Sequence, residues 1–272
     1  MEKTYYVVSD IHERIDLLDE SIKRHIDFSD SENILILLGD YVDGTTKTES
    51  YHTLQYIYDL QLVYPHQVIV LKGNHEQWLC DYLHQRKSIL QTYVEPDDDT
   101  LESFIPLNER EKMYEQVYMQ SHNLEQLGKN IKRLRCQYIL KHHQELIDWV
   151  SKLPCYYENE DCIFVHAGIN ILDGCHELWK ETSTIDDYLM QYPANLTDQL
   201  DKVIIAGHVG TSGIKNDTYF HDIYRYKNKI FLDSAVEISN KLNLLKIYHH
   251  QYLEIYKKDG QWVERLLPDI VD

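Results

Sequence analysis

The sequence lacks any long apolar stretch. Its densest apolar run, Ile34 to Leu38, is far too short to cross a bilayer. Met1 to Asp10 contains no basic segment followed by an apolar one, as a secretory leader would. We therefore expect a soluble, cytoplasmic protein that does not act at a membrane.

Cysteines are few, and their spacing excludes two common kinds of site. Their number is odd, and no pair is spaced as Cys-x-x-Cys, which argues against a disulfide framework and against a zinc knuckle. We predict that all of them are buried free thiols. They are Cys80, Cys136, Cys155, Cys162 and Cys175.

Basic residues are outnumbered by acidic ones. The chain has 27 Lys and Arg against 45 Asp and Glu, a formal net charge of −18 with neutral histidines. This charge repels a polyphosphate backbone unless metal ions or local cations intervene, so we expect no nonspecific binding of nucleic acid. The 272 residues, 43% of them hydrophobic, are enough to bury a sizeable core.

The N-terminal part alternates between two kinds of pattern. Tyr5 to Ser9, Ile34 to Gly39 and Gln67 to Leu71 are short apolar runs with many β-branched or aromatic residues, which predict strands. Between them, apolar residues recur at three- and four-residue steps, which predicts two helices that pack on a sheet. The chain therefore opens as β-α-β-α-β.

The middle and the end of the chain differ in the same way. Residues from about 77 to 153 form a polar segment with helical periodicity, interrupted at Pro96 to Asp99 and at Pro106. We predict one domain over residues 1–272, in which this segment is a helical insertion. After Pro154 we expect an antiparallel ending with strands at Cys162 to Val165, Val203 to Ala206, Lys229 to Leu232, Leu244 to Tyr248 and Tyr252 to Tyr256.

Polar residues directly follow five of the predicted strands. The first strand ends in Asp10-Ile11-His12, where a turning backbone can aim an oxygen and a nitrogen ligand at one point. Ligand sites favour such strand ends. The other four ends read Gly39-Asp40-Tyr41-Val42-Asp43-Gly44, Gly73-Asn74-His75-Glu76, His166-Ala167-Gly168 and Gly207-His208.

Each of these features alone has an ordinary explanation. A single Asp after a strand is usually a turn residue or a helix N-cap, and a single His is usually part of the core or the surface. Five such endings in chain order are not explained in that way. Their carboxylate, amide and imidazole groups suit Mn, Fe, Zn or Mg, so they predict a metal site.

Together these motifs resemble the calcineurin-like metallophosphoesterases. Within that family the chain is similar to the bacterial and phage relatives of Ser/Thr protein phosphatases and to symmetrical diadenosine tetraphosphatases. The patterns D-x-H, G-D-x-V-D, G-N-H-E, H-x-G and a late G-H occur in the family's order between Tyr5 and about Leu245. The resemblance implies an α/β fold, a β-sandwich flanked by helices with a helical cap.

The resemblance also implies a role for each position. One metal ion would be held by Asp10, His12 and Asp40, and a second by Asp40, Asn74, His166 and His208, with Asp40 shared. Two divalent ions about 3.5 to 4 Å apart can neutralise phosphate charge and organise in-line attack. We expect Mn, with Fe, Zn or Mg as alternatives. His75 would be the general acid, and Asp43 would fix its tautomer.

The chain departs from the protein-phosphatase pattern at the phosphate-gripping position. An Arg follows G-D-x-V-D in that pattern, whereas this sequence continues Gly44-Thr45-Thr46. Another cation could replace the missing guanidinium, although a solvated surface charge is the commoner role for each candidate. The candidates are Arg14, Arg86 and Lys180.

Two further positions bear on the substrate. Gly210 stands where many phosphodiesterases of the family have a second His, and Asp43 is usually missing from the diadenosine tetraphosphatase branch. Both favour a phosphomonoesterase that acts on a phosphorylated small molecule, a nucleotide or a phosphoprotein. The alternatives are a dinucleoside polyphosphate hydrolase and a catalytically silent binding protein.

Overall fold

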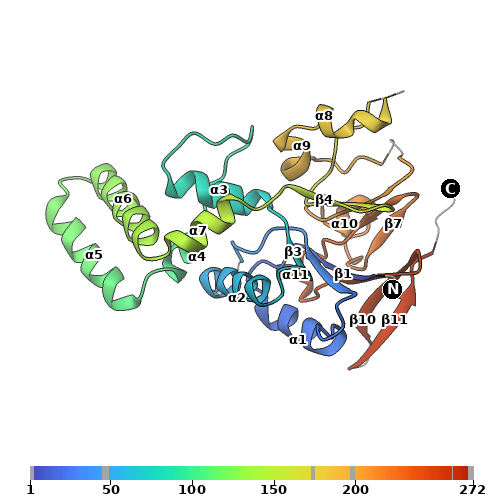
Figure 1. Cartoon of the computed structure of the whole chain (residues 1–272). Coiled ribbons are helices and arrows are strands. Elements are labelled where there is room, and N and C mark those ends of the chain that lie inside the picture. The colour runs from blue at the N-terminus through green and yellow to red at the C-terminus, as the bar shows by residue number, and fades with distance from the viewer. Residues whose placement is uncertain (1–2, 45–48, 173–174, 197–199, 259, 269–272) are drawn as a thin grey trace.

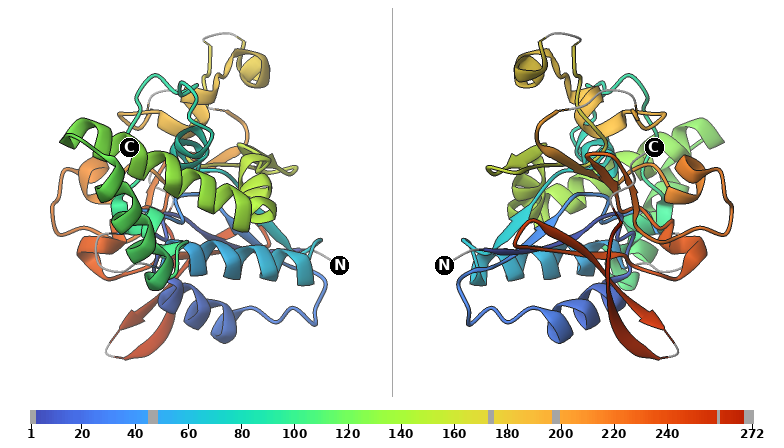
Figure 2. Two further views of the ribbon diagram at one scale, coloured as in Figure 1. Left: turned by 90° about the vertical axis from the view of Figure 1, so that its left-hand side faces the viewer. Right: turned by 90° about the vertical axis from the view of Figure 1, so that its right-hand side faces the viewer.

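Two β-sheets face each other at the centre of the molecule (Figure 1). The structure is a computed structural model that describes residues 3–44, 49–172, 175–196, 200–258 and 260–268. Helices cover the outer face of each sheet, so the chain is arranged in four layers, which Figure 2 shows from two sides. The predicted α/β sandwich flanked by helices is therefore confirmed.

The first sheet joins the two ends of the chain. Its strands β1 and β2 and its strands β2 and β3 pair in parallel, as expected for the β-α-β-α-β opening, and β9 pairs antiparallel with β1. In the order β11-β10-β9-β1-β2-β3, the strands are Gln261–Leu266, Gln251–Lys258, Leu244–Tyr248, Thr4–Val8, Asn33–Leu37 and Val68–Val70.

The second sheet contains the later strand ends of the predicted site. In the order β4-β5-β6-β8-β7, its strands are Tyr156–Glu158, Cys162–Val165, Val203–Ala206, Lys229–Phe231 and Tyr224–Tyr226. The expectation of an antiparallel ending is wrong here, because β5, β6 and β8 run parallel. Parallel neighbours need long crossover connections, and helices of the chain's second half occupy these. Among the described strands after Pro154, β4–β5, β7–β8 and the β9–β10–β11 meander are antiparallel as expected.

The core lies on both faces of the first sheet. Along β1, Val7 points between the two sheets, while Tyr6 and Val8 pack against the helices on the other side. Successive side chains of a strand point to opposite faces. A strand that is covered on both faces therefore needs the continuous apolar run seen in the sequence rather than an alternating one.

The helices fall into two groups. Those on the outer faces of the sheets, or in the connections between strands, are α1 (Ile15–His25), α2 (Ser50–Val63), α8 (Trp179–Thr182), α9 (Ile185–Met190), α10 (Thr211–Lys215) and α11 (Val236–Ser239), with a 3-10 turn at His176–Leu178. Those of the middle segment are α3 (Asn74–Leu83), α4 (Asp98–Ser103), α5 (Leu107–Gln120), α6 (Leu124–His142) and α7 (Gln144–Ser151).

The middle segment projects to one side of the sheets, where α5 and α6 lie farthest out (Figure 1). Asp97 and Pro106 stand at the N-caps of α4 and α5, so the predicted breaks are helix starts. That residues 77–153 are an insertion into one domain stays a prediction. Of the cysteines, Cys80, Cys136 and Cys162 are buried and the other two are partly exposed.

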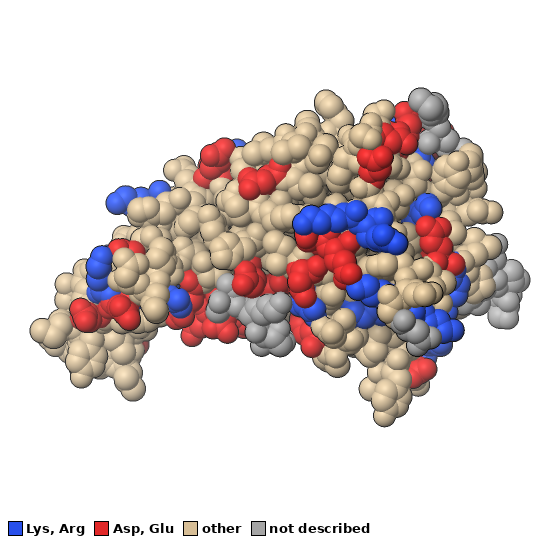
Figure 3. Space-filling model, turned by 90° about the horizontal axis from the view of Figure 1, so that it is seen from below, with Lys and Arg blue, Asp and Glu red and all other residues tan. Residues whose placement is uncertain are grey.

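Two expectations from the sequence can be compared with the helices and the surface: the absence of a membrane span and the excess of acidic residues. None of the helices within the described residues is long and apolar enough to cross a membrane. On the face seen from below, Lys and Arg side chains lie next to Asp and Glu side chains (Figure 3). Surface ion pairs of this kind include Lys257 with Glu20 and Lys246 with Glu264.

Candidate metal centre

The predicted ligands follow strands of both sheets and meet at one edge of the sandwich. Parallel strands bring their carboxyl ends to the same edge, and β1, β2 and β3 are parallel, as are β5 and β6. The turns after these strands deliver Asp10 and His12, Asp40 and Asp43, Asn74 and His75, His166, and His208.

Asp40 lies at the centre of this cluster and is only 3% exposed. Its Oδ2 atom is 3.4 Å from Nε2 of His166 and 3.8 Å from Nε2 of His12. Nε2 of His75 is also 3.8 Å from the same oxygen. One carboxylate oxygen thus faces imidazoles that come from β1, β3 and β5.

Two sets of side chains around Asp40 have the arrangement of metal-ligand groups. The ligand atoms of His12, Asp40 and His75 all lie within 4.8 Å of one another, and so do those of Asp40, His166 and His208. Both sets share Asp40, as the predicted bridging carboxylate does. The first set contains His75, which the sequence predicts as the general acid rather than as a ligand.

The two predicted ligands outside these sets are tied to their members. Asn74 Oδ1 lies 2.8 Å from Nε2 of His166, so its amide oxygen faces the second set. The carboxylate of Asp10 accepts the backbone N–H of His208 at 3.1 Å to each oxygen. The structure therefore brings all six predicted ligands to one edge, with Asp10 held by a backbone bond.

The backbone at this edge is unusual. Five predicted site residues adopt left-handed φ angles between 41° and 63°: Asp10, His12, Asp40, Asp43 and His208. Such conformations cost of order 1–3 kcal/mol for most non-glycine residues and cluster at functional sites. Two glycines make room beside these turns, since a Cβ at Gly73 would collide with Asp40 and one at Gly207 with Asp10.

Glu76 connects two of the turns. Its Oε2 accepts the N–H groups of Asp40 and Gly73, both at 2.9 Å, and its Oε1 accepts that of Tyr41 at 2.8 Å. The side chain is fully buried. It therefore satisfies three backbone donors and fixes the end of β2 relative to the end of β3. The sequence shows Glu76 within a motif but does not reveal this role.

Hydrogen bonds orient the two histidines that face Asp40 from the first set. Nδ1 of His12 lies 2.9 Å from the carbonyl oxygen of Val42, which places the ring proton on Nδ1 and leaves the Nε2 lone pair toward Asp40. Nδ1 of His75 lies 2.7 Å from Oδ2 of Asp43. The ring of Trp78 contacts His75 edge to face, with ring centroids 4.8 Å apart.

Asp43 is itself held by the middle segment. Its Oδ1 accepts the hydroxyl of Thr100 at 2.5 Å and the backbone N–H of Asp97 at 3.1 Å. Thr100 belongs to α4, so a helix of the predicted cap reaches the pair formed by Asp43 and His75. The sequence contains no local signal for this contact, because the two residues are far apart in the chain.

The pKa values of the cluster are shifted in opposite directions. Burial and the nearby negative charges of Asp233 and Asp40 raise the pKa of Asp10 well above its usual value. Burial also raises the pKa of Asp40, but the charges of His166 and His75 outweigh it and hold that pKa well below its usual value. Burial, reinforced by His166, lowers the pKa of His208 to about 4.

His75 differs from the other histidines of the site. Burial lowers the pKa of its imidazole, but the charge of Asp40 and the hydrogen bond that the ring donates to Asp43 outweigh this effect and raise the pKa to about 9. A protonated imidazole is the state that donates a proton. His208 differs, because its lowered pKa leaves the ring neutral at neutral pH, with a lone pair free to be offered.

The residues fit a pair of divalent cations. Nδ1 of the fully buried His166 has no hydrogen-bond partner within the described residues, so a buried lone pair or N–H of this ring is left unsatisfied. The ion pairs of Asp40 and Asp43 within the described chain are all with histidines. Carboxylate, amide and imidazole donors around an acidic centre are the ligands of Mn, Fe, Zn or Mg.

Two buried carboxylates near the centre were not predicted. Asp233 follows β8, and burial, with the charge of Asp40, raises its pKa. Glu13 is hydrogen-bonded to Ser50, and burial raises its pKa to about 7. Asp233 repeats the pattern of a strand followed directly by Asp, so this signal was present in the sequence at a sixth strand end.

The three candidate cations are engaged elsewhere. Arg14 pairs with Asp16 at 2.8 Å and also bonds Asn240, Arg86 pairs with the buried Asp81 at 3.0 Å, and Lys180 pairs with Glu158. Thr45 and Thr46, which follow Gly44 where the related pattern has Arg, lie outside the described residues. Each of the three candidate cations is thus already paired with an acidic side chain, and none of the three is free to replace the missing guanidinium.

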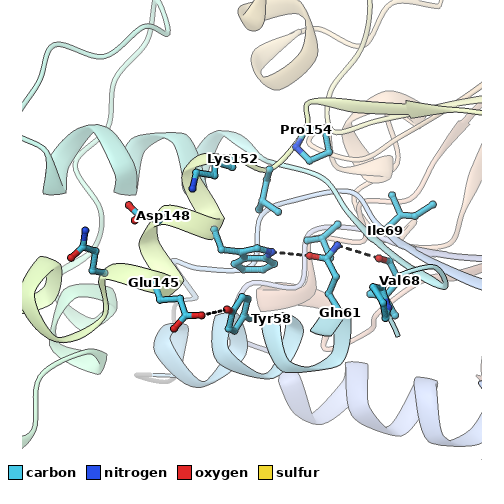
Figure 4. A pocket seen from close by; sticks show the side chains of 13 residues that line it. Tyr58, Gln61, Val68, Ile69, Glu145, Asp148, Lys152 and Pro154 are labelled. Carbon is cyan, nitrogen blue, oxygen red and sulfur yellow. Dashed lines mark hydrogen bonds between the residues drawn. The ribbon is translucent and has the colours of Figure 1, made fainter. Parts of the chain in front are cut away.

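The most voluminous of the cavities described is not at this site. It has a volume of about 790 Å³ and lies between α2, α7 and β3, where Tyr58 bonds Glu145 and Gln61 bonds both Trp149 and the Val68 carbonyl (Figure 4). None of the predicted site residues lines it. The chemistry of the strand ends, rather than cavity size, therefore identifies the candidate site.

The family model described as calcineurin-like phosphoesterase matches residues 3–233, which confirms the resemblance seen in the motifs. A comparison with curated proteins gives no match.

Solved structures share the fold at low sequence identity. A cold-active protein-tyrosine phosphatase of a psychrophilic Shewanella species is 16% identical, with 98% of this chain and 81% of that chain covered and a TM-score of 0.58. A proposed diadenosine tetraphosphatase is 13% identical, with 96% of each chain covered and a TM-score of 0.53. At these identities the likeness concerns the fold alone.

Proposed function

We propose that this chain, which belongs to the calcineurin-like phosphoesterase family, is a phosphomonoesterase that depends on two divalent metal ions. As a member of that family it is a phosphoric ester hydrolase. The observation that carries the finer proposal is the position of Asp40, whose carboxylate is shared by two potential ligand sets. We propose Mn as the metal, with Fe, Zn and Mg as alternatives of the same ligand chemistry.

The proposed ligands divide between two ions. Asp10, His12 and Asp40 would hold one, and Asp40, Asn74, His166 and His208 the other. When bound, such a pair neutralises phosphate charge and organises a water for in-line attack. The turns that deliver the ligands are held by Glu76 and by the Asp10–His208 backbone bond, so the protein orients these groups before substrate binds.

His75 is the proposed proton donor to the leaving oxygen. Asp43 accepts the Nδ1 proton of this ring at 2.7 Å and so fixes which nitrogen faces outward. The Nε2–H then remains available for the alcohol that leaves. Asp43 is a positioning residue in this scheme, and Thr100 positions Asp43 in turn.

A phosphomonoester fits the site better than a dinucleoside polyphosphate. A polyphosphate chain brings several extra negative charges into an edge already crowded with carboxylates, and the candidate cations Arg14, Arg86 and Lys180 are paired elsewhere. The presence of Asp43 beside His75 supports the same choice. A phosphorylated small molecule, a nucleotide or a phosphoprotein would each supply one terminal phosphate.

The test is a metal-dependence assay with matched substrates. Purified protein is stripped with EDTA, reloaded with Mn, Zn or Mg, and assayed on p-nitrophenyl phosphate, bis-p-nitrophenyl phosphate and diadenosine tetraphosphate. We expect turnover of the monoester to vanish after stripping and to return with Mn. Turnover that survives EDTA would contradict metal dependence, and preferential cleavage of diadenosine tetraphosphate would establish the alternative function.

A further inference from the structure

A second cavity directly adjoins the candidate metal centre. It has a volume of about 420 Å³ and lies between the segment 192–196 and α10 with the turn that precedes it. His208 lines this cavity and also belongs to one of the two potential ligand sets. A phosphate held at the metal centre would therefore have this cavity next to it.

The described lining of the cavity carries no charged side chain. None of its described residues is Lys, Arg, Asp or Glu, and its polar side-chain groups are the Ser212 hydroxyl, the Tyr192 hydroxyl and the His208 ring. This differs sharply from the acidic centre beside it. We call it the aryl pocket; its apolar side chains are Tyr192, Pro193, Ala194, Leu196, Val209 and Ile214.

One wall of the aryl pocket is fixed to the centre. Gln191 packs on Gly168, two residues after His166, and its amide donates to the Ile169 carbonyl at 3.0 Å. The N–H of Ala167 donates to the carbonyl of Tyr188 at 2.8 Å, which ties α9 to the end of β5. The segment that begins with Tyr192 is thus held at a defined place relative to the ligand His166.

Tyr192 is the notable residue of this wall, because 78% of its surface is exposed. An exposed ring that lines a cavity beside a phosphate site offers a face for stacking. Aromatic rings prefer offset-stacked or edge-to-face partners and gain energy from them beyond simple burial. A small aromatic group is the partner that this surface fits.

We propose that the aryl pocket binds the aromatic ring of an aryl phosphate monoester whose phosphate occupies the metal centre. This inference rests on the proposed function and names the substrate class within it. A pocket without a charged side chain among its described residues gives no counter-charge to a second phosphate. An aryl ester places ring and phosphate side by side.

Direct binding of two phosphonates tests the pocket without a leaving group. Phenylphosphonate and methylphosphonate carry the same anionic head, and only the first has a ring. Titration calorimetry on the Mn-loaded protein gives both dissociation constants. We expect Tyr192→Ala to weaken phenylphosphonate by about three- to tenfold, the size of an aromatic pair, and to leave methylphosphonate within about twofold.

The chain offers a matched control for this variant. Tyr118 is 77% exposed and lies on α5, outside the aryl pocket, so Tyr118→Ala removes an equally exposed ring and should change neither constant. Circular dichroism melting curves verify that both variants fold. Equal losses for the two phosphonates in Tyr192→Ala, or no loss for either, would overturn the inference.

A second variant fills the pocket instead of emptying it. Gly213 lines the pocket, and a Cβ built there meets no atom within 4 Å, so Gly213→Leu enters open space. We expect it to weaken phenylphosphonate selectively, whereas Gly128→Leu on α6, equally free of contacts, has no effect. If the loaded wild-type protein binds neither phosphonate and hydrolyses no monoester, the proposed function itself falls and takes this inference with it.

Discussion

Two regions of the molecule bury charge in different ways. In the middle segment, Arg135 is 8% exposed and donates to Asp98 and Glu102, and to the hydroxyl of Tyr114 at 2.6 Å. At the strand ends, the acidic groups around Asp40 face histidines and one another. The first region contains its own counter-charge. In the second, the histidines are the facing groups, and we propose that metal ions complete the balance of charge.

The difference separates a structural network from a functional one. Burying a charge is costly unless the charge is paired. Removing one partner of a buried pair therefore leaves the other as an unpaired buried charge. Arg135 therefore acts on the stability of the helices α4 to α6. Around Asp40, folding instead leaves charge unbalanced, and the pKa values there are perturbed. Perturbed pKa values are common at functional sites.

The largest expected effect is that of Asp40→Asn. It removes the charge of the shared ligand, and since metal ions supply several kcal/mol of transition-state stabilisation, turnover of p-nitrophenyl phosphate should fall about a thousandfold or more. Bound Mn, measured by elemental analysis, should fall with it. Asp98→Asn in the paired network is the control and should retain both metal and turnover. Full Mn occupancy in Asp40→Asn would show that the charge of Asp40 is not needed to hold metal. It would contradict the proposed difference between the two regions.

His75→Asn should have the next largest effect. The variant keeps every proposed metal ligand but loses the proton donor, so hydrolysis of phenyl phosphate should slow by roughly a hundredfold. The better leaving group of p-nitrophenyl phosphate should suffer less. His84→Asn, at the other end of α3, should change neither rate. Unchanged kinetics in His75→Asn would refute the acid role, and loss of metal would make His75 a ligand.

Arg135→Met tests the paired region. It removes the shared partner of Asp98 and Glu102. Because the Asp98 side chain is 79% exposed and Glu102 still pairs with Arg110, we expect a loss of about 2 kcal/mol, below the range for a fully buried pair. Urea denaturation measures this loss, while Mn content should stay unchanged. Lys129→Met, which breaks the exposed pair with Glu125 on the same helix, should cost less than about 0.5 kcal/mol.

The smallest effect concerns a side-chain contact that joins the two regions. Thr100→Val removes the hydroxyl that donates to Asp43, and the looser Asp43–His75 pair should lower kcat on phenyl phosphate about three- to tenfold with metal retained. Thr53→Val is the matched control, since that buried hydroxyl has no hydrogen-bond partner within the described chain. An unaltered kcat in Thr100→Val would mean that the helices do not assist the chemistry.

Much of this site could be predicted because its signals are local. A strand that is buried on both faces is a continuous apolar run, and the polar residue after it is visible in the same few letters, as at Val165-His166. Asp233 follows β8 in the same manner and could have been found by the same rule. The order of these endings is what the resemblance to the family rested on, and the family model matches residues 3–233.

What could not be predicted depends on distance in the chain. The parallel pairing of β5, β6 and β8 is set by long crossovers, which resemble loops between short strands when only sequence is seen. The contact of Thr100 with Asp43 joins residues 57 positions apart. The aryl pocket likewise needs Tyr192 and His208 side by side, which follows from packing and not from any motif.

The left-handed turns have a consequence for changing the metal preference of this site. Asp, Asn and His are the non-glycine residues that most readily adopt positive φ, so the backbone and the cation select the same few residue types. A designer who wanted a softer metal would place Cys at His12 or His208. A Cys at either position would have to adopt an unfavourable positive φ angle, whether or not a metal ion is bound. The positive φ angles of these turns therefore restrict the residue types at this site as much as coordination chemistry does.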